Sequence, residues 1–299
     1  MRILLTGTAG QVGAALLPLL RLHGEVLAPT RNEFDLSKPE ALAGRLDELK
    51  PDLIFNPAAY TAVDRAEDEA ELAFRINAEA PSRMAGWAAR HGVPLFHFST
   101  DYVFDGSGDK PWREDSSPGP LSVYGASKLA GDEAIRAANG PHLIVRTSWV
   151  YAHEGVNFLR TIARLAGERK ELRIVADQIG APTSARVIAR AVAEILSSNL
   201  EHFADGSAWR GDIVNVVCAG ETSWYGFATA IVDGLKSRGV KLEVESIVPI
   251  GTKDFPTKAK RPGNSRLDLR RLKEAFGIVT PSWNEALAVE LDALAGEVR

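Results

Sequence analysis

Short apolar runs alternate along the first half of the chain with longer segments whose apolar residues recur at helical spacing. The short runs predict buried strands at residues 3–5, 25–28, 52–56, 93–99 and 142–146. The longer segments predict helices at 11–22, 39–49, 70–90 and 124–138. Pro18 is compatible with the first helix only if that helix kinks or ends early. This alternation with short links predicts an α/β fold, a doubly wound parallel sheet with helices on both faces.

The pattern beyond residue 150 is less regular. It predicts a helix at 158–165, a strand at 172–175, a helix at 183–196, a strand at 212–217 and a long loop at 249–265. A loop of that length is expected to be a lid or a binding loop. We therefore expect a larger N-terminal domain over 1–149, with 183–219 packing back onto it. A smaller C-terminal α/β substrate domain is expected over most of 150–299.

Composition and charge narrow the classes of partner. The 299 residues are 45% hydrophobic, enough for a sizeable core, and carry a net charge of −4 without a basic run, so nucleic acid is not an expected partner. No apolar run reaches about 18 residues, so no membrane span is expected. Cys218 is the only cysteine, which fits a reducing cytoplasm. The histidines lack metal-ligand spacing and are expected on the surface or in local hydrogen bonds; they are His23, His91, His97, His142, His153 and His202.

A glycine-rich segment, Gly7-Thr-Ala-Gly-Gln-Val-Gly13, links the first predicted strand to the first predicted helix. Glycines allow a sharp turn and close approach of the backbone to a pyrophosphate, and the helix N-terminus offers free N–H groups. The spacing is G-x-x-G-x-x-G, and a glycine triplet alone also occurs in plain turns. Its position between strand and helix predicts a Rossmann-type NAD(P)-binding site.

The end of the second strand bears on the choice of cofactor. An acidic residue there would accept a hydrogen bond from the adenosine ribose, but this chain has Arg31 close to that point. An arginine suits a 2′-phosphate, so NADPH is favoured and NADH stays possible. The alternative, that Arg31 is a solvated loop residue, remains open. Asp35 lies slightly later and could accept from the adenine amino group.

The segment Tyr124-Gly-Ala-Ser-Lys128 carries the candidate chemistry. Residues four apart share a helix face, so Tyr124 and Lys128 are expected to point into one space. An ammonium group there, with the oxidised nicotinamide, is expected to lower the pKa of the phenol. Tyr124 would then protonate the alkoxide formed as hydride arrives at carbon. The same spacing alone is common on helix surfaces, but here Thr100 ends the fourth strand, where its hydroxyl can donate to a carbonyl.

These motifs resemble the extended short-chain dehydrogenase/reductases over nearly the whole chain. The resemblance is carried by Gly7-Thr-Ala-Gly-Gln-Val-Gly13, Asn56-Pro-Ala-Ala-Tyr-Thr-Ala-Val-Asp64, Ser99-Thr-Asp-Tyr-Val-Phe-Asp-Gly106, Pro120-Leu-Ser-Val-Tyr-Gly-Ala-Ser-Lys-Leu-Ala-Gly131, Arg146-Thr-Ser-Trp-Val-Tyr151, Asp177-Gln-Ile-Gly-Ala-Pro-Thr183 and Arg261-Pro-Gly-Asn-Ser-Arg-Leu-Asp268. The first and fourth are similar to many reductases and epimerases. The third, sixth and seventh resemble the branch that reduces the C4 ketone of dTDP-4-dehydro-β-L-rhamnose with NAD(P)H.

The resemblance implies roles for individual residues. The implied catalytic residues are Thr100, Tyr124 and Lys128. The implied cofactor-binding residues are Gly7, Gly10, Gln11, Val12, Gly13, Asp35, Leu36, Ala58, Ala59, Tyr60 and Asn77. They join Arg31, Tyr124 and Lys128, which were singled out above. The implied substrate-binding residues are Thr100, Asp101, Trp149, Asn157 and Arg261, with ordinary core packing as the alternative for Trp149. Arginine binds phosphate bidentately, which suits Arg261 for a dianionic sugar nucleotide.

One departure from the family concerns a metal. Some relatives carry a glutamate after the third glycine, linked to a magnesium-bridged dimer, whereas this chain has Ala14 and Ala15 there. No metal site is therefore expected, magnesium is doubtful, and the chain is expected to be a monomer or a weak homodimer. Two other functions stay open. One is a sugar-nucleotide epimerase or dehydratase, although a dehydratase would want a carboxylate pair where this chain has only Asp101. The other is a non-catalytic regulatory subunit.

Overall fold

A parallel sheet forms the centre of the molecule. The computed structural model describes residues 1–199 and 211–298, and within them six strands pair in the order β10-β5-β4-β3-β1-β2. These strands are β1 (Arg2–Leu5), β2 (Glu25–Leu27), β3 (Leu53–Asn56), β4 (Leu95–Thr100), β5 (His142–Thr147) and β10 (Asp212–Asn215). All five pairings between them are parallel. The predicted doubly wound α/β class is confirmed.

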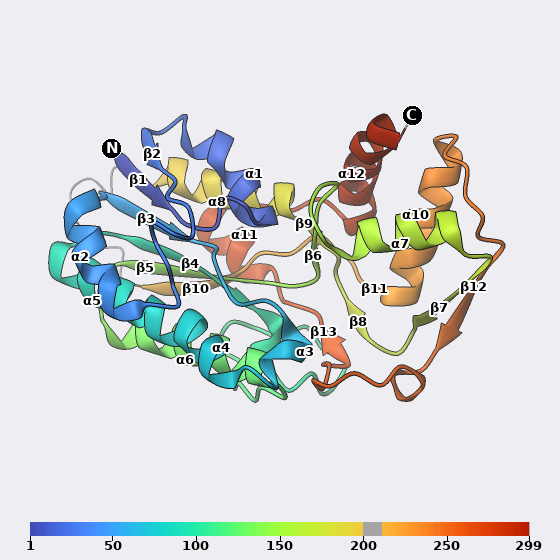
Figure 1. Cartoon of the computed structure of the whole chain (residues 1–299), viewed down its shortest axis with the longest axis horizontal. Coiled ribbons are helices and arrows are strands. Elements are labelled where there is room, and N and C mark those ends of the chain that lie inside the picture. The colour runs from blue at the N-terminus through green and yellow to red at the C-terminus, as the bar shows by residue number, and fades with distance from the viewer. Residues whose placement is uncertain (200–210, 299) are drawn as a thin grey trace.

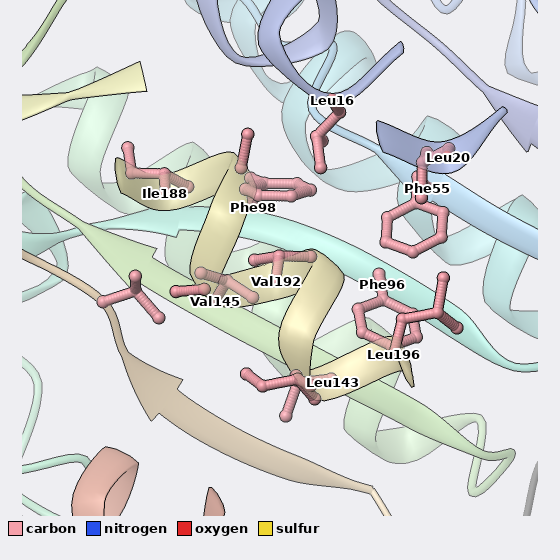
Figure 2. Close-up of a cluster of buried hydrophobic side chains, with 14 of the residues drawn as sticks. Leu16, Leu20, Phe55, Phe96, Phe98, Leu143, Val145, Ile188, Val192 and Leu196 are labelled. Carbon is pink, nitrogen blue, oxygen red and sulfur yellow. The ribbon is translucent and has the colours of Figure 1, made fainter. Parts of the chain in front are cut away.

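Helices cover both faces of this sheet (Figure 1). One face packs against α1 (Gln11–Leu20), α8 (Ala185–Ser198) and α11 (Arg270–Phe276). The other packs against α2 (Pro39–Leu49), α5 (Ala80–His91) and α6 (Val123–Ala137). Successive strand side chains point to opposite faces, so Ile3 and Leu5 join the first core while Leu4 joins the second. Figure 2 shows Leu16 and Leu20 of α1 and Ile188, Val192 and Leu196 of α8 over Phe55, Phe96, Phe98, Leu143 and Val145.

A third apolar cluster lies beside the sheet, around Tyr151 and Phe227. It is formed by α7 (Phe158–Glu168), α10 (Trp224–Ser237) and α12 (Trp283–Val298), with the paired strands β7 (Glu171–Val175) and β12 (Ser246–Ile250). Short strands connect the two regions: β6 (Val150–Tyr151) pairs with β9 (Thr183–Ser184), and β8 (Ile179–Gly180) pairs with β11 (Thr222–Ser223) and β13 (Asn264–Ser265). The helices α10, α11 and α12 were not predicted.

Several predicted boundaries were wrong. The helix expected over 70–90 is α4 (Ala70–Phe74), a π-helical turn (Arg75–Glu79) and then α5, and a short α3 (Val63–Ala66) precedes them. Pro81 lacks the N–H that would continue an α-helical ladder from Asn77, so the backbone changes pitch there. The first helix ends at Leu20, two residues after Pro18. The loop expected over 249–265 begins later, because Pro249 and Ile250 belong to β12.

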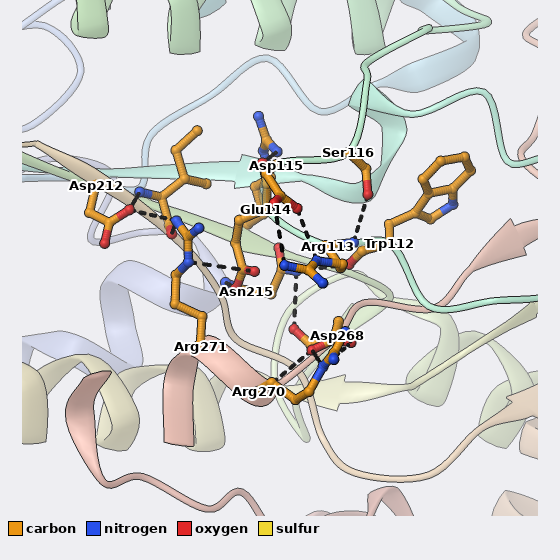
Figure 3. Close-up of polar contacts among 12 residues, drawn as sticks. Trp112, Arg113, Glu114, Asp115, Ser116, Asp212, Asn215, Asp268, Arg270 and Arg271 are labelled. Carbon is orange, nitrogen blue, oxygen red and sulfur yellow. Dashed lines mark hydrogen bonds and ion pairs between the residues drawn. The ribbon is translucent and has the colours of Figure 1, made fainter. Parts of the chain in front are cut away.

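The outer edge of the sheet is covered by a polar network (Figure 3). The backbone N–H of Asn215, in the edge strand β10, donates to the Glu114 carboxylate at 3.0 Å. Arg271 of α11 lies 3.8 Å from the same carboxylate and 2.7 Å from Asp212. An uncovered strand edge can pair with a strand of another molecule, so these contacts protect the sheet from such association. Burial raises the pKa of Glu114.

Candidate active site

The glycine segment forms a tight turn where the strand order changes direction, between β1 and β3. Gly7 has φ +62°, and a Cβ there would lie 2.9 Å from the Cα of Ala58. A Cβ on Gly13 would lie 2.2 Å from the carbonyl oxygen of Gly7. The helix that follows has no side-chain cap at Gly10 and no acidic residue in its first turn. Its free N–H groups therefore fit an anionic pyrophosphate, and the buried Oε1 of Gln11 has no hydrogen-bond partner in the described structure.

The residues expected at the adenosine follow β2. Arg31 is exposed and forms no ion pair within the part of the chain that the structure describes. Asp35 accepts hydrogen bonds from the N–H (3.0 Å) and hydroxyl (2.7 Å) of Ser37. Burial raises its pKa, but these two bonds and the nearby charges of Arg31 and Lys38 together outweigh burial and lower it. Leu36 is buried in the core, so only its backbone remains for a ligand.

Asn77 links the end of β3 to the helix that carries the tyrosine and lysine. Its side chain accepts from the Tyr60 N–H at 2.8 Å and donates to the Tyr60 carbonyl at 3.0 Å. It also lies 3.0 Å from the hydroxyl of Ser127, one turn of α6 from Tyr124. The π-helical turn thus presents Asn77 where it connects Tyr60 to α6, in agreement with a supporting role.

The position of α6 is set by close backbone contacts. Ser122 caps the helix by accepting from the Gly125 N–H at 3.1 Å. A Cβ on Gly125 would lie 2.2 Å from the Tyr102 carbonyl oxygen, and one on Gly131 would lie 2.1 Å from that of Asn77. Only glycine lets the helix approach both backbones so closely, and this approach positions Tyr124 and Lys128.

Tyr124 lies beside Thr100 and at an edge-on angle to Tyr102, with ring centroids 5.5 Å apart. Burial raises the pKa of Tyr124, the hydrogen bond with Thr100 opposes the shift, and nearby Asp101 adds to it. The expectation of a lowered phenol pKa was therefore wrong for the protein without cofactor, because burial and the nearby acidic groups outweigh the hydrogen bond with Thr100. A neutral phenol is nevertheless the form that can donate a proton.

Lys128 is fully buried one helical turn after Tyr124. Its Nζ donates to the Phe98 carbonyl at 2.7 Å and lies 2.9 Å from Nε2 of His97. Burial lowers the pKa of Lys128 to about 8, and the carboxylate of Asp132 acts in the opposite direction. His97 had been expected on the surface or in a local hydrogen bond. That was wrong, since it is fully buried in β4 and contacts this ammonium.

Asp101 is a carboxylic acid close to Tyr124, and it is 2% exposed. Burial raises its pKa to about 7, and the nearby hydroxyl groups of Ser265, Thr100 and Ser148 act in the opposite direction. Among these hydroxyls, that of Thr100 donates a hydrogen bond to the carboxyl group at 3.2 Å. Ser148 follows β5 and Ser265 belongs to β13, so three distant segments meet at this carboxyl group. Sequence analysis missed both serines, although each lies inside a motif of the family resemblance.

Trp149 has φ +48°, a left-handed conformation that is strained for a bulky residue. Its ring stacks on Trp224 with centroids 3.6 Å apart, and a Cβ on Gly180 would lie 2.8 Å from it. Trp224 also donates to the Gln178 side chain at 3.2 Å. Strain of this kind is concentrated at functional sites, which supports a role for Trp149 beyond packing.

The two remaining residues expected at the substrate have partners already. Asn157 caps α7 by accepting from the Arg160 N–H at 3.2 Å, and its Nδ2 donates to the carbonyls of Ala152 and Glu154 at 2.8 Å. Arg261 donates to Asp64 at 2.5 Å and to the Tyr102 hydroxyl at 3.1 Å. The loop between β12 and β13 is thereby attached to α3, close to Tyr102.

No group of three or more metal-binding side chains occurs among the described residues, which leave out His202. None of the described helices is long and apolar enough to cross a bilayer.

The parallel sheet, the glycine turn at its switch point and the Tyr124–Lys128 pair beside Thr100 define an oxidoreductase that uses a nicotinamide cofactor, of the short-chain dehydrogenase/reductase class. The family model described as the RmlD substrate binding domain matches residues 1–295, and the chain belongs to this family.

Relatives agree with this assignment. The chain is 45% identical over 291 residues to dTDP-4-dehydrorhamnose reductase from Burkholderia thailandensis, with 97% of each chain covered. Among solved structures, a dTDP-4-dehydrorhamnose reductase from Clostridium acetobutylicum is similar with a TM-score of 0.88 at 35% identity, over 98% of this chain and 99% of that one. The enzyme of that name from Bacillus anthracis, in complex with NADP, has a TM-score of 0.87 at 31% identity over the same shares.

Proposed function

We propose that the protein reduces the C4 ketone of dTDP-4-dehydro-β-L-rhamnose to dTDP-L-rhamnose with NADPH, the last step of dTDP-rhamnose biosynthesis. The observation that supports the proposal is that Tyr124 lies beside Thr100 at the carboxyl end of β4, with Lys128 buried one helical turn further along α6 and in contact with the same strand. Relatives at 45% and 40% identity that carry the name of this reductase support it.

Three residues divide the chemistry that the cofactor leaves to the protein. The reduced nicotinamide supplies a hydride to C4 of the sugar. The Thr100 hydroxyl donates a hydrogen bond to the ketone oxygen, and the neutral phenol of Tyr124 gives that oxygen its proton. The Lys128 ammonium stabilises the tyrosinate that remains, which then takes up a proton from solvent.

The sugar nucleotide is assigned to the opposite side of the site. We propose that Asp101 and Trp149 contact the sugar, and that Asn157 and Arg261 face the nucleotide. For Arg261, binding a diphosphate means sharing or exchanging its contact with Asp64. In this division 1–149 and much of 183–219 bind the cofactor, and the rest of 150–299 binds the substrate.

NADPH is proposed over NADH because Arg31 is exposed and unpaired among the described residues, and no acid takes the usual ribose position. The NADP complex of the Bacillus anthracis relative supports this preference. We also propose a monomer or weak homodimer that needs no magnesium, because Ala14 and Ala15 offer no ligand after the glycine turn. Full activity in excess EDTA is expected; activity lost with EDTA and restored by magnesium would refute the metal-free proposal.

The test is incubation with NADPH and dTDP-4-dehydro-6-deoxy-L-mannose, supplied directly or made in place by a 3,5-epimerase. We expect one NADPH to be oxidised per dTDP-L-rhamnose formed. The loss of nicotinamide absorbance measures this oxidation. Isomerised sugar without net oxidation would indicate an epimerase. Binding of both ligands without turnover would indicate a regulatory subunit.

A further inference from the structure

His97 occupies an unusual place for a histidine. It lies within β4 with its side chain fully buried, three residues before Thr100. Its Nε2 is 2.9 Å from the Lys128 ammonium, and its Nδ1 is 3.1 Å from the side-chain amide of Asn56 in the next strand. The Lys128 ammonium thus contacts two polar groups of β4, the Phe98 carbonyl and this imidazole.

The hydrogen-bond requirements decide the protonation state of this imidazole. An ammonium group has donors only, so the atom facing it must accept, and Nε2 must carry a lone pair. The ring proton then sits on Nδ1 and needs an acceptor. Rotating the Asn56 side-chain amide by about 180° places its oxygen, in place of its NH₂ group, opposite Nδ1 and supplies that acceptor. In this orientation the Asn56 NH₂ group donates to Thr6 Oγ1 at 2.7 Å, and Thr6 still accepts from the Ala58 N–H at 3.3 Å.

We propose that His97 is a positioning residue, a neutral imidazole that accepts a hydrogen bond from Lys128 and holds the ammonium in place next to Tyr124. The contacts continue through Asn56 and Thr6 to Ala58, whose backbone touches the glycine turn. The lysine on α6 and the cofactor-binding turn after β1 are thereby held in one connected array.

Burial supports this role. Loss of water disfavours the charged lysine, whose pKa is about 8, so each acceptor that remains keeps it ionised. Burial and the neighbouring Lys128 charge hold the pKa of His97 well below its usual value, which agrees with a neutral ring.

Other titratable groups lie around α6, and a substitution at His97 keeps all of them in the chain. Asp132 on the same helix faces Lys128 and is paired with Arg146 of β5 at 3.3 Å. Asp101 and Tyr102 act on Tyr124, and Glu67 accepts from the first turn of α6 at 2.9 Å. A pH effect specific to His97 can therefore be separated from these charges.

The kinetic test compares His97→Leu with His97→Gln, and it rests on the proposed reductase activity. A glutamine oxygen can reach the position of Nε2, whereas leucine leaves Lys128 without that acceptor. In His97→Leu we expect kcat at pH 8 to fall about 10- to 100-fold, the size of one hydrogen bond to a charged group, with KM for NADPH nearly unchanged. The alkaline loss of activity should begin at a lower pH, because the lysine pKa falls further, and His97→Gln should restore most of both.

His142→Gln is the matched control. His142 is another buried strand histidine, at the start of β5, and its Nδ1 faces the Gly140 carbonyl at 2.8 Å. We expect this substitution to leave the alkaline limb unmoved. An equal, pH-independent loss in His97→Leu and His97→Gln would show that His97 only packs the core and would overturn the proposal.

A second measurement is independent of catalysis. In the cofactor-free protein with ¹⁵N-labelled histidine, the His97 signals are identified by their disappearance in His97→Gln. NMR is expected to show a neutral ring with its proton on Nδ1 from about pH 5.5 to 7, where Lys128 is still an ammonium group. A proton on Nε2, or an imidazolium in this range, would overturn the proposal even if the reductase assignment holds. The expected tautomer would stand even if the substrate assignment failed.

Discussion

The glycine turn and the Tyr124–Lys128 pair of the cofactor side each come from one short segment of the chain, whereas the sugar side is assembled from segments far apart. Gly7 and Gly13 meet within one turn, and Tyr124 and Lys128 lie on one helix. In contrast, Asp101 meets serines from β13 and from the end of β5, and Trp149 stacks on Trp224 of α10. The cofactor side depends on where the backbone can approach, and the sugar side on how distant elements pack.

The largest expected effect tests the cofactor side. Tyr124→Phe removes one hydroxyl and little volume, so turnover should fall about 10²–10⁴-fold, the usual contribution of general acid catalysis. The dissociation constant for NADPH should stay the same, measured by fluorescence titration. A variant that keeps more than about a tenth of the rate would show that Tyr124 is not the acid.

The next effect concerns the choice between cofactors. If Arg31 binds the 2′-phosphate, kcat/KM should favour NADPH over NADH by about 10- to 100-fold, and Arg31→Ala should remove this preference. Salt should weaken it, because Arg31 is exposed. Arg136→Ala, an exposed arginine near the far end of α6, serves as the control. Equal values for both cofactors in the native protein would show that Arg31 is a solvated loop residue.

A smaller effect tests whether close backbone contacts hold the cofactor side together. Gly125→Ala places a methyl group against the Tyr102 carbonyl, so we expect the free energy of unfolding to fall by about 1–3 kcal/mol. Gly44→Ala in α2 meets no atom within 4 Å and should be neutral or stabilising by up to about 1 kcal/mol. Urea unfolding measures both, and equal stabilities would contradict the contact.

The smallest effect concerns Asp101 on the sugar side. Its folded-state pKa, about 7, lies above the unfolded value, so ionisation destabilises the fold as pH rises through 7. Asp101→Asn removes that charge, and its Tm relative to the native protein should increase from pH 5 to pH 8.5. Asp177 is the control: burial raises its pKa, but hydrogen bonds from Thr252 outweigh burial and lower it, so Asp177→Asn should lose stability above pH 4. A Tm difference for Asp101→Asn that does not change with pH would contradict the raised pKa of Asp101.

The same contrast explains which features could be predicted from the sequence. The sheet and the glycine turn follow from local patterns, since buried runs and glycine spacing depend on neighbouring residues. The partners of Asp101 could not be predicted, because Ser148 and Ser265 reach it only after β5 and β13 are in place. His97 gave one usable signal, a histidine between the apolar residues of a strand that ends at Thr100. Its contact with Lys128 required the packing of α6 on β4.

The most direct test of the central claim follows the hydrogen atom. NADPH carrying deuterium at the transferable position of the nicotinamide is incubated with the enzyme and the dTDP-4-dehydro sugar, and the product is analysed by mass spectrometry and NMR. We expect one deuterium at C4 of dTDP-L-rhamnose for each NADPH oxidised, and about 10²–10⁴-fold less labelled product from Tyr124→Phe over the same time. Sugar product without deuterium at C4, or turnover without oxidised cofactor, would contradict the account.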